Sequence, residues 1–165
     1  MMVNNSVEDI KVFGMGLSKT GTKSLANALS QFGLEIIHFP SVNQLIKGNG
    51  AVDTPVIAFL PQLLQLFPNA KFICTTRDID DWLVSCKKHF KPSNNYYIHQ
   101  IRMLVYGSIL PKEDDFIKTW WRHQELIKSL NPLIINVFND SDNSLHKIGE
   151  YLNLIPPNIN FPHIK

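Results

Sequence analysis

A glycine-bearing loop near the start of the chain gathers a lysine and several hydroxyl groups. It reads Gly14-Met15-Gly16-Leu17-Ser18-Lys19-Thr20-Gly21-Thr22-Lys23-Ser24. At the beginning of a helix, such a loop presents unpaired backbone N–H groups and the positive end of the helix dipole. Lys19 adds a cation, and Thr20, Thr22 and Ser24 add hydroxyls. These groups suit an anion such as a phosphate or sulfate. A plain helix cap formed by threonine or serine is the simpler alternative.

The loop departs from the P-loop of nucleoside triphosphatases, which has the pattern G-x-x-x-x-G-K-[ST]. Gly16 and Gly21 have the right separation, but Thr22 stands where the lysine belongs, and the lysine lies inside the loop at position 19. Asp78, which directly follows Arg77, is not an obvious magnesium ligand. The loop therefore gives only weak support to a kinase that uses magnesium-ATP, which we keep as an alternative function.

A second anion-binding pair follows a β-rich stretch at residues 71–76. Arg77 comes directly after that stretch, and Ser85 follows two helical turns later. A guanidinium binds phosphate through two parallel hydrogen bonds. Ser85 would lie on the side of the following helix that faces the loop. The competing interpretation pairs Arg77 with Asp80 or Asp81 and gives Ser85 no role.

Predicted strands and helices alternate along the chain, as the hydrophobic periodicity and the glycine and proline breaks indicate. We predict strands at 11–16, 34–39, 71–76 and 133–138, and helices at 24–32, 57–67, 79–90, 96–106, 114–130 and 144–152. This alternation predicts a three-layer α/β/α domain over residues 1–165 with a central parallel sheet. Ligands of such sheets bind beyond the carboxyl ends of the strands, where the loop and Arg77 would both lie.

Residues 18–25 resemble the 5′-phosphosulfate loop of the sulfotransferases, which reads K/R-[ST]-G-T before a helix. The resemblance implies a fold like that of the P-loop nucleoside triphosphate hydrolases. It also implies the donor 3′-phosphoadenosine 5′-phosphosulfate (PAPS), which is released as 3′,5′-adenosine bisphosphate (PAP). Arg77 and Ser85 match the pair that binds the 3′-phosphate in this family. By the same match, the 5′-phosphosulfate is held by Ser18, Lys19, Thr20, Gly21, Thr22, Lys23 and Ser24.

The resemblance extends beyond these two anchors to one branch of the sulfotransferases. Asp53-Thr54-Pro55 matches its D-x-P motif, and Phe67-Pro68-Asn69-Ala70-Lys71 matches its Y/F-P-x-A-K lead into the next strand. The later Phe161-Pro162-His163 is similar to its F-P-H. A counterpart of the R-K-G motif of cytosolic members is not evident.

The resemblance implies in-line sulfuryl transfer that needs no metal ion, with Lys19 stabilising the leaving group. A general base near the sulfur would contribute roughly 10²–10⁴-fold. His38, at the end of a predicted strand, and Asp53, in the D-x-P motif, are equally good candidates. Their simpler roles are a hydrogen-bonded strand-end histidine and a helix cap. The remaining alternative is a non-catalytic relative that keeps the nucleotide site as a binding module.

The composition of the chain limits its protein class and the kinds of molecule it could bind. The chain has 165 residues, 16 lysines and arginines against 14 acidic residues, and 44% hydrophobic residues. These values disfavour a disordered chain and a nucleic-acid-binding surface, and no apolar run is long enough to span a membrane. Residues 1–9 lack the pattern of a signal peptide, so we expect a cytoplasmic protein. Its acceptor is expected to be a small molecule or a carbohydrate.

Overall fold

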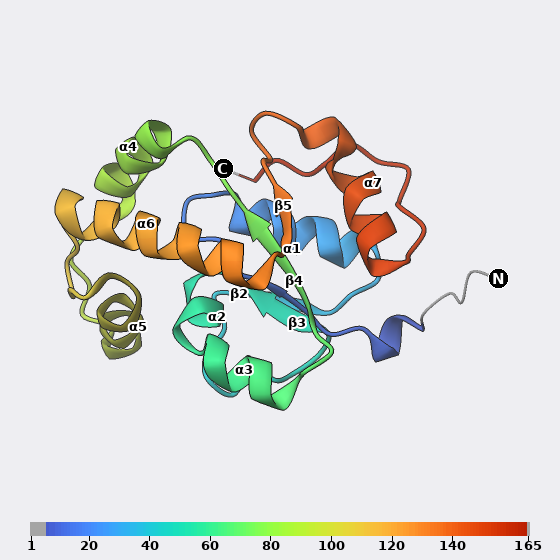
Figure 1. Ribbon diagram of the computed structural model, residues 1–165, viewed down its shortest axis with the longest axis horizontal. Coiled ribbons are helices and arrows are strands. Elements are labelled where there is room, and N and C mark those ends of the chain that lie inside the picture. Colours follow the sequence, from blue (N-terminus) through green and yellow to red (C-terminus); the bar gives the residue numbers. More distant parts are fainter. Residues whose placement is uncertain (1–5, 165) are drawn as a thin grey trace.

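Five short strands form one parallel sheet at the centre of the protein (Figure 1). The computed structural model describes residues 6–164; residues 1–5, on which the signal-peptide prediction partly rests, lie outside this range. The sheet order is β2-β3-β1-β4-β5. The strands are β1 (Val12–Gly14), β2 (Ile36–His38), β3 (Gly50–Val52), β4 (Lys71–Thr75) and β5 (Leu133–Ile135). All pairings are parallel, as predicted.

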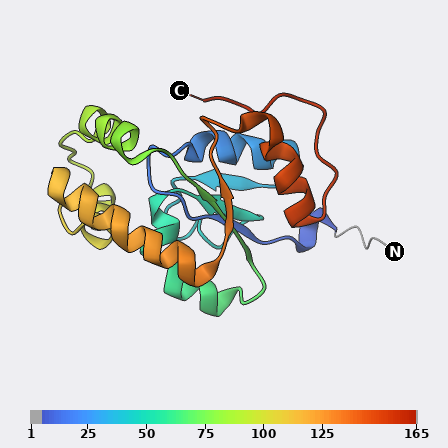
Figure 2. The same ribbon diagram turned by 45° about the horizontal axis from the view of Figure 1, so that its top comes forward.

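Helices cover both faces of the sheet and complete the predicted three layers (Figure 2). Helices α1 and α7 pack on one face, and α2, α3 and α6 pack on the other. Helices α4 and α5 lie against the outer half of α6. After a short 3-10 helix at Val7–Asp9, the bounds are α1 (Thr22–Gln31), α2 (Thr54–Ala58), α3 (Leu60–Leu66), α4 (Ile79–His89), α5 (Tyr96–Tyr106), α6 (Glu113–Leu130) and α7 (Ser141–Leu152).

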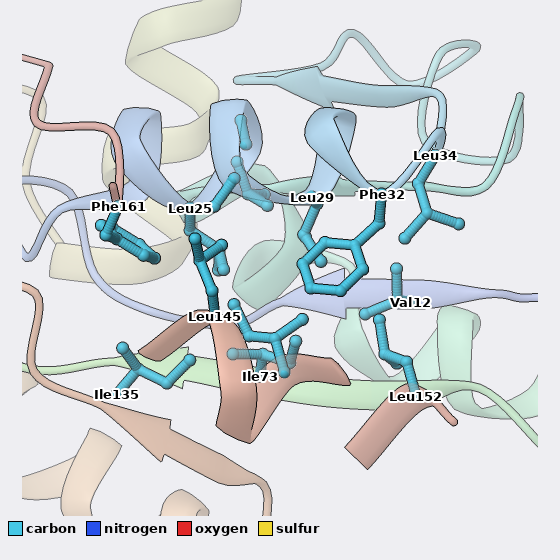
Figure 3. Close-up of a cluster of buried hydrophobic side chains, with 14 of the residues drawn as sticks. Val12, Leu25, Leu29, Phe32, Leu34, Ile73, Ile135, Leu145, Leu152 and Phe161 are labelled. Carbon is cyan, nitrogen blue, oxygen red and sulfur yellow. The ribbon is translucent and has the colours of Figure 1, made fainter. Parts of the chain in front are cut away.

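The hydrophobic core is divided by the sheet because successive strand side chains point to opposite faces. On β1, Val12 belongs to the cluster of buried side chains that also holds Leu25 of α1 and Leu145 of α7 (Figure 3). The next residue, Phe13, packs with the helices of the opposite face. This alternation fixes β1 in the middle of the sheet and holds the start of α1 close to its carboxyl end.

Strand β3 was not predicted from the sequence. It is three residues long and begins with Gly50, a residue type that strands disfavour. The structure shows why glycine stands there: Gly50 has φ 151°, and a Cβ on it would lie 1.7 Å from the carbonyl oxygen of Val12. Only a residue without a side chain can pair this closely with β1.

Two other predicted elements are shorter or divided. The helix predicted at 57–67 is two helices, α2 and α3, which meet at Phe59. Strand β5 ends at Ile135, because Asn136 Oδ1 accepts hydrogen bonds from the N–H groups of Phe138 and Asn139 at 3.1 and 3.2 Å and closes a turn. Within residues 6–164, no helix has the length and apolar character needed to cross a membrane.

Candidate functional site

The carboxyl ends of the strands open onto one cavity of about 810 Å³. Its lining includes Lys19 after β1, His38 of β2, Asp53 after β3, Arg77 after β4 and Phe138 after β5. The volume lies within the range of roughly 300–1,000 Å³ that is usual for ligand sites. All five strands therefore contribute to one site at the edge where parallel α/β sheets bind ligands.

The loop between β1 and α1 is tightly fitted to its neighbours. A Cβ at Gly16 would lie 2.1 Å from Thr75 Oγ1, and Gly21 has φ 100°. Thr20 Oγ1 donates to the carbonyl oxygen of Leu17 at 2.6 Å and forms a 2.7 Å hydrogen bond with Thr75 Oγ1. The buried Trp82 of α4 donates its indole N–H to the carbonyl oxygen of Ser18 at 2.8 Å. These contacts fix the loop before any ligand binds.

The cavity offers fixed positive charge. The N-terminus of α1 opens onto it, and Thr22, the first residue of that helix, is part of its lining. The cationic lining residues are Lys19, Lys23, Arg77 and Lys88. Backbone N–H groups at a helix N-terminus bind anions, and the cations reinforce them. The site is therefore suited to a ligand with several negative charges.

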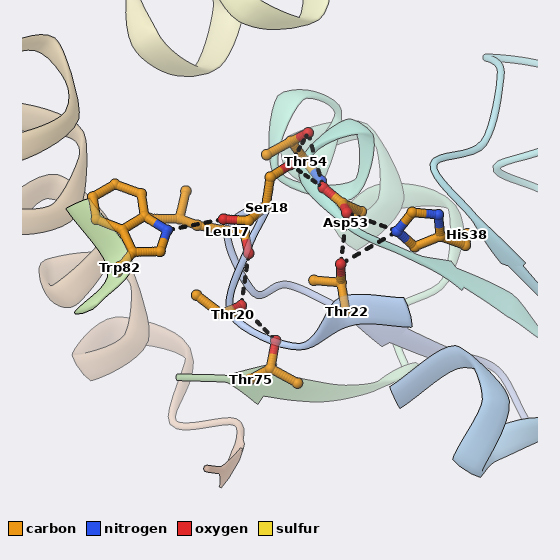
Figure 4. A network of polar contacts seen from close by, with 9 residues as sticks. All are labelled: Leu17, Ser18, Thr20, Thr22, His38, Asp53, Thr54, Thr75 and Trp82. Carbon is orange, nitrogen blue, oxygen red and sulfur yellow. Dashed lines mark hydrogen bonds and ion pairs between the residues drawn. The ribbon is translucent and has the colours of Figure 1, made fainter. Parts of the chain in front are cut away.

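Asp53 organises a dense network of hydrogen bonds beside the loop (Figure 4). Ser18 Oγ donates to Oδ1 at 2.5 Å, and Thr22 Oγ1 donates to Oδ2 at 2.6 Å. The N–H of Thr54 donates to Oδ1 at 2.6 Å, and His38 Nε2 lies 2.9 Å from Oδ2. Because an ionised carboxylate can only accept hydrogen bonds, the imidazole nitrogen that faces Asp53 is the one that carries a proton.

The environment of Asp53 stabilises its ionised form. Burial raises the pKa of this carboxyl, but the hydrogen bonds from His38, Ser18 and Thr22 outweigh burial and hold the pKa below its ordinary value of 3.8. The backbone of Asp53 has φ 87°, a conformation that costs a residue with a side chain about 1–3 kcal/mol. Such strain persists only where the surrounding contacts over-determine it, and here it positions the carboxylate within the network.

Arg77 lines the same cavity as this network. Its Nη1 donates to the carbonyl oxygen of Lys19 at 3.3 Å, and its guanidinium carbon lies 4.2 Å from the ring centroid of Phe138. Its Nε is buried without a hydrogen-bond partner. In residues 6–164 it forms no ion pair with Asp80 or Asp81. An unsatisfied donor in a ligand-sized cavity indicates a missing acceptor.

The comparisons with known proteins agree with this geometry. The model of the sulfotransferase domain family matches residues 11–47 and 41–147, which is most of the chain. The chain belongs to the sulfotransferase family. It is also similar to Ava biosynthesis cluster protein M of Aspergillus versicolor, with 28% identity over a match that covers 46% of this chain. That match spans 41% of the length of the relative.

Most of the site residues predicted from the sequence line this cavity. They are Ser18, Lys19, Gly21, Thr22, Lys23, His38, Asp53, Arg77 and Ser85. The side chains of Thr20 and Ser24 do not. Thr20 is committed to Leu17 and Thr75, and the hydroxyl of Ser24 accepts the N–H of Ile164 at 3.0 Å. These two hydroxyls stabilise the loop and the C-terminal segment instead.

Several residues of the candidate site were not predicted from the sequence. Phe138 lay within a predicted strand and gave no sign of a role beneath Arg77. Trp82 could have been singled out, because a buried indole N–H needs an acceptor. The sequence gives no reason to single out His89, yet it lines the cavity at the end of α4. The nearby charge of Lys19, followed by slight desolvation and by the charges of Lys88 and Lys91, lowers the pKa of His89.

Proposed function

We propose that the protein transfers a sulfuryl group from PAPS to a hydroxyl or amine acceptor. One observation carries the proposal: the lysine-bearing loop and Arg77 line the same cavity. PAPS has anionic groups at both its 5′ and 3′ positions, so its site needs two anion-binding parts within the span of one nucleotide. The membership in the sulfotransferase family supports the same conclusion.

The residues present fit the nucleotide. The buried Nε of Arg77 has no partner, and a phosphate would satisfy it together with a neighbouring N–H of the guanidinium. Ser85 lines the same cavity and supplies a hydroxyl for the 3′-phosphate. At the other end, Lys19, Lys23 and the N-terminal N–H groups of α1 hold the 5′-phosphosulfate.

The chain supplies electrostatic stabilisation for the transfer. Bound at the loop, PAPS provides a sulfuryl group whose leaving oxygen belongs to a phosphate. Lys19 neutralises the charge that develops on this oxygen, and the N–H groups of α1 bind the sulfonate oxygens. This arrangement requires no metal ion. A magnesium ion would need a free carboxylate ligand, and both oxygens of Asp53 already accept hydrogen bonds from the chain. A reaction that uses magnesium-ATP is therefore less well supported.

We assign the general base to His38 and give Asp53 the task of orienting it. His38 Nε2 donates to Asp53, so Nδ1 keeps the lone pair that can accept the proton of the acceptor. The carboxylate then stabilises the imidazolium, as a buried aspartate does for the histidine of a catalytic triad. The lowered pKa of Asp53 favours this division, because a strongly stabilised carboxylate is a poor base.

Nucleotide binding and turnover test the function. PAP at 100 times its Kd stabilises a protein by about 2.7 kcal/mol, which raises the Tm of a chain of this size by roughly 5–11 °C. We expect this shift in the wild type and in the control Lys118→Ala, an exposed lysine outside the cavity. Lys19→Ala and Arg77→Ala should lose most of it. Sulfated product should form when PAPS and an acceptor are added.

Two outcomes would favour other functions. A larger shift with magnesium-ATP, unchanged in Arg77→Ala, would indicate a kinase. A clear shift with PAP, but no sulfated product from any phenol, alcohol, amine or sugar tried, would indicate a nucleotide-binding protein without catalysis.

A further inference from the structure

A second cavity opens beside the nucleotide cavity. Its volume is about 160 Å³, and it shares Ser18, Lys19, Phe39 and His89 with the larger one. A molecule in the smaller cavity would therefore meet the loop at Lys19, where the sulfuryl group is proposed to lie. We call the smaller space the acceptor cavity. The assignment rests on the proposed function.

The walls of the acceptor cavity are largely apolar. Phe39, Phe90, Ile98 and Ile101 line it. An engineered apolar cavity of about 150 Å³ binds benzene, so this volume suits one aromatic ring. A sugar would bring several hydroxyls to walls that cannot satisfy them, and each unsatisfied polar group is costly to bury. Arg102 also lines this cavity. Its Nη1 already donates to the carbonyl oxygens of Lys91 and Ile109.

One buried hydroxyl stands at the wall of this cavity, beside Ser18. Tyr106 is 3% exposed, and its hydroxyl interacts with that of Ser18 without full hydrogen-bond geometry. Burial raises the pKa of this phenol well above 10, so the hydroxyl keeps its proton. Buried tyrosine hydroxyls usually find a partner. The Tyr106 hydroxyl therefore adds a second polar group beside Ser18 at this wall of the cavity.

Ser18 links the acceptor cavity to the Asp53 network. Its hydroxyl donates to Asp53 Oδ1 at 2.5 Å, so its lone pairs are left to accept a hydrogen bond. Thr54 lines the same cavity and lies 3.3 Å from Ser18, measured between the two hydroxyl oxygens. The hydroxyls of Ser18 and Thr54 therefore lie together where the cavity meets the loop.

We propose that the acceptor cavity binds a single-ring phenol or benzylic alcohol, with Tyr106 and Ser18 positioning its hydroxyl. The ring lies among Phe39, Phe90 and Ile98, and the hydroxyl faces the loop. In the transfer, the acceptor oxygen forms a bond to sulfur as the bond from sulfur to the phosphate oxygen breaks. The acceptor hydroxyl reaches past the loop to His38 in the adjoining nucleotide cavity, His38 takes its proton, and PAP leaves with the bonding electron pair.

An acceptor panel with matched variants tests the proposal. The acceptors are phenol, benzyl alcohol, glucose and the four-ring phenol 1-hydroxypyrene, with PAPS as donor and sulfated product measured by mass spectrometry. Ile98→Trp fills the half-buried wall of the cavity, and Met103→Trp places the same ring on the exposed side of α5 as a control. Tyr106→Phe removes only the hydroxyl.

The wild type should sulfate phenol or benzyl alcohol with a kcat/KM at least tenfold above that for glucose and 1-hydroxypyrene. Ile98→Trp should lower kcat/KM for the single-ring acceptor at least tenfold, and Met103→Trp should not. Tyr106→Phe should raise the KM for the acceptor about fivefold, as expected for one hydrogen bond, and leave kcat within about twofold. The Tm shift with PAP should remain in all three variants.

Three results would overturn the assignment of this cavity: preference for glucose, equal use of 1-hydroxypyrene, or unchanged phenol kinetics in Ile98→Trp. If no acceptor is turned over, ligand-observed NMR of phenol with saturating PAP decides the matter. Phenol that binds to the wild type and not to Ile98→Trp supports the cavity, and phenol that fails to bind contradicts it. A wild type that does not bind PAP at all would instead contradict the proposed function.

Discussion

The guanidinium of Arg77 donates a hydrogen bond from Nη1 to the carbonyl oxygen of Lys19 at 3.3 Å. This contact joins the loop after β4 to the loop after β1, although the two residues are 58 positions apart in the sequence. Lys19 itself has φ 73°, a left-handed conformation that is uncommon for lysine. The two proposed anion-binding parts are therefore tied together by the chain before a nucleotide binds.

Replacing His38 tests the proposed base. His38→Asn should lower kcat by roughly 10²–10⁴-fold, the usual contribution of a general base, and leave the affinity for PAP within about twofold. His146→Asn, on the exposed side of α7, is the matched control and should keep wild-type activity. If His38→Asn keeps wild-type kcat while Asp53→Asn abolishes turnover without weakening PAP binding, Asp53 is the base instead.

Asp53 should make stability depend on pH. Its pKa in the folded protein is below the ordinary value of 3.8, so the unfolded state takes up its proton first as pH falls. The stabilisation is fully present above about pH 4–5 and is lost as pH falls through 3.8 toward the lower folded pKa. We expect Asp53→Asn to reduce the free energy of unfolding by about 2–4 kcal/mol at pH 7, because donors lose a charged acceptor.

Denaturant titrations at several pH values measure this effect. The difference between the wild type and Asp53→Asn should shrink steadily below pH 4. Asp142→Asn, on the exposed first turn of α7, provides the control for a carboxylate outside the site. A difference that stays constant from pH 7 to pH 3 would show that the network does not stabilise the charged form of Asp53.

Gly50→Ala tests the close approach of β3 to β1. The new Cβ would lie 1.7 Å from the carbonyl oxygen of Val12, so the strand pairing must open. We expect a loss of about 3 kcal/mol or more, as for other severe backbone conflicts, and a Tm lower by roughly 6–12 °C. Gly33→Ala is the control: its φ is 82° but its Cβ would meet no atom within 4 Å. Only the left-handed backbone then contributes, about 1–2 kcal/mol. Equal losses in the two variants would show that the clash at Gly50 is relieved elsewhere.

The sequence predicted the parts of the fold that depend on local pattern. The helix at 96–106 was predicted with its observed bounds, because Asn95 caps its start and Gly107 ends it in the left-handed conformation. Strand β3 was missed because its three residues depend on pairing with β1 and β2 and carry little strand propensity of their own. Local propensity is a weak guide wherever tertiary contacts decide the conformation.

Some residues of the candidate site could be predicted from the sequence, and others could not. Lys19 and Arg77 could be found from motif spacing, since both follow predicted strands. The partner of His38 could not, because Asp53 meets it only through the pairing of β2 with β3. Nor could the sequence show that the hydroxyl of Ser24 is used by the C-terminal segment, a contact across 140 residues.

The most direct test of the account compares two nucleotides by isothermal titration calorimetry. PAP carries a 3′-phosphate, and adenosine 5′-monophosphate lacks it. Arg77→Lys keeps the charge but loses the planar fork, so it should weaken PAP binding about 10–100-fold and leave the affinity for the monophosphate unchanged. Lys19→Ala should weaken both nucleotides, and the control Arg122→Lys should weaken neither. If Arg77→Lys weakens the two nucleotides equally, or weakens neither, Arg77 does not bind the 3′-phosphate and the proposed nucleotide site is wrong.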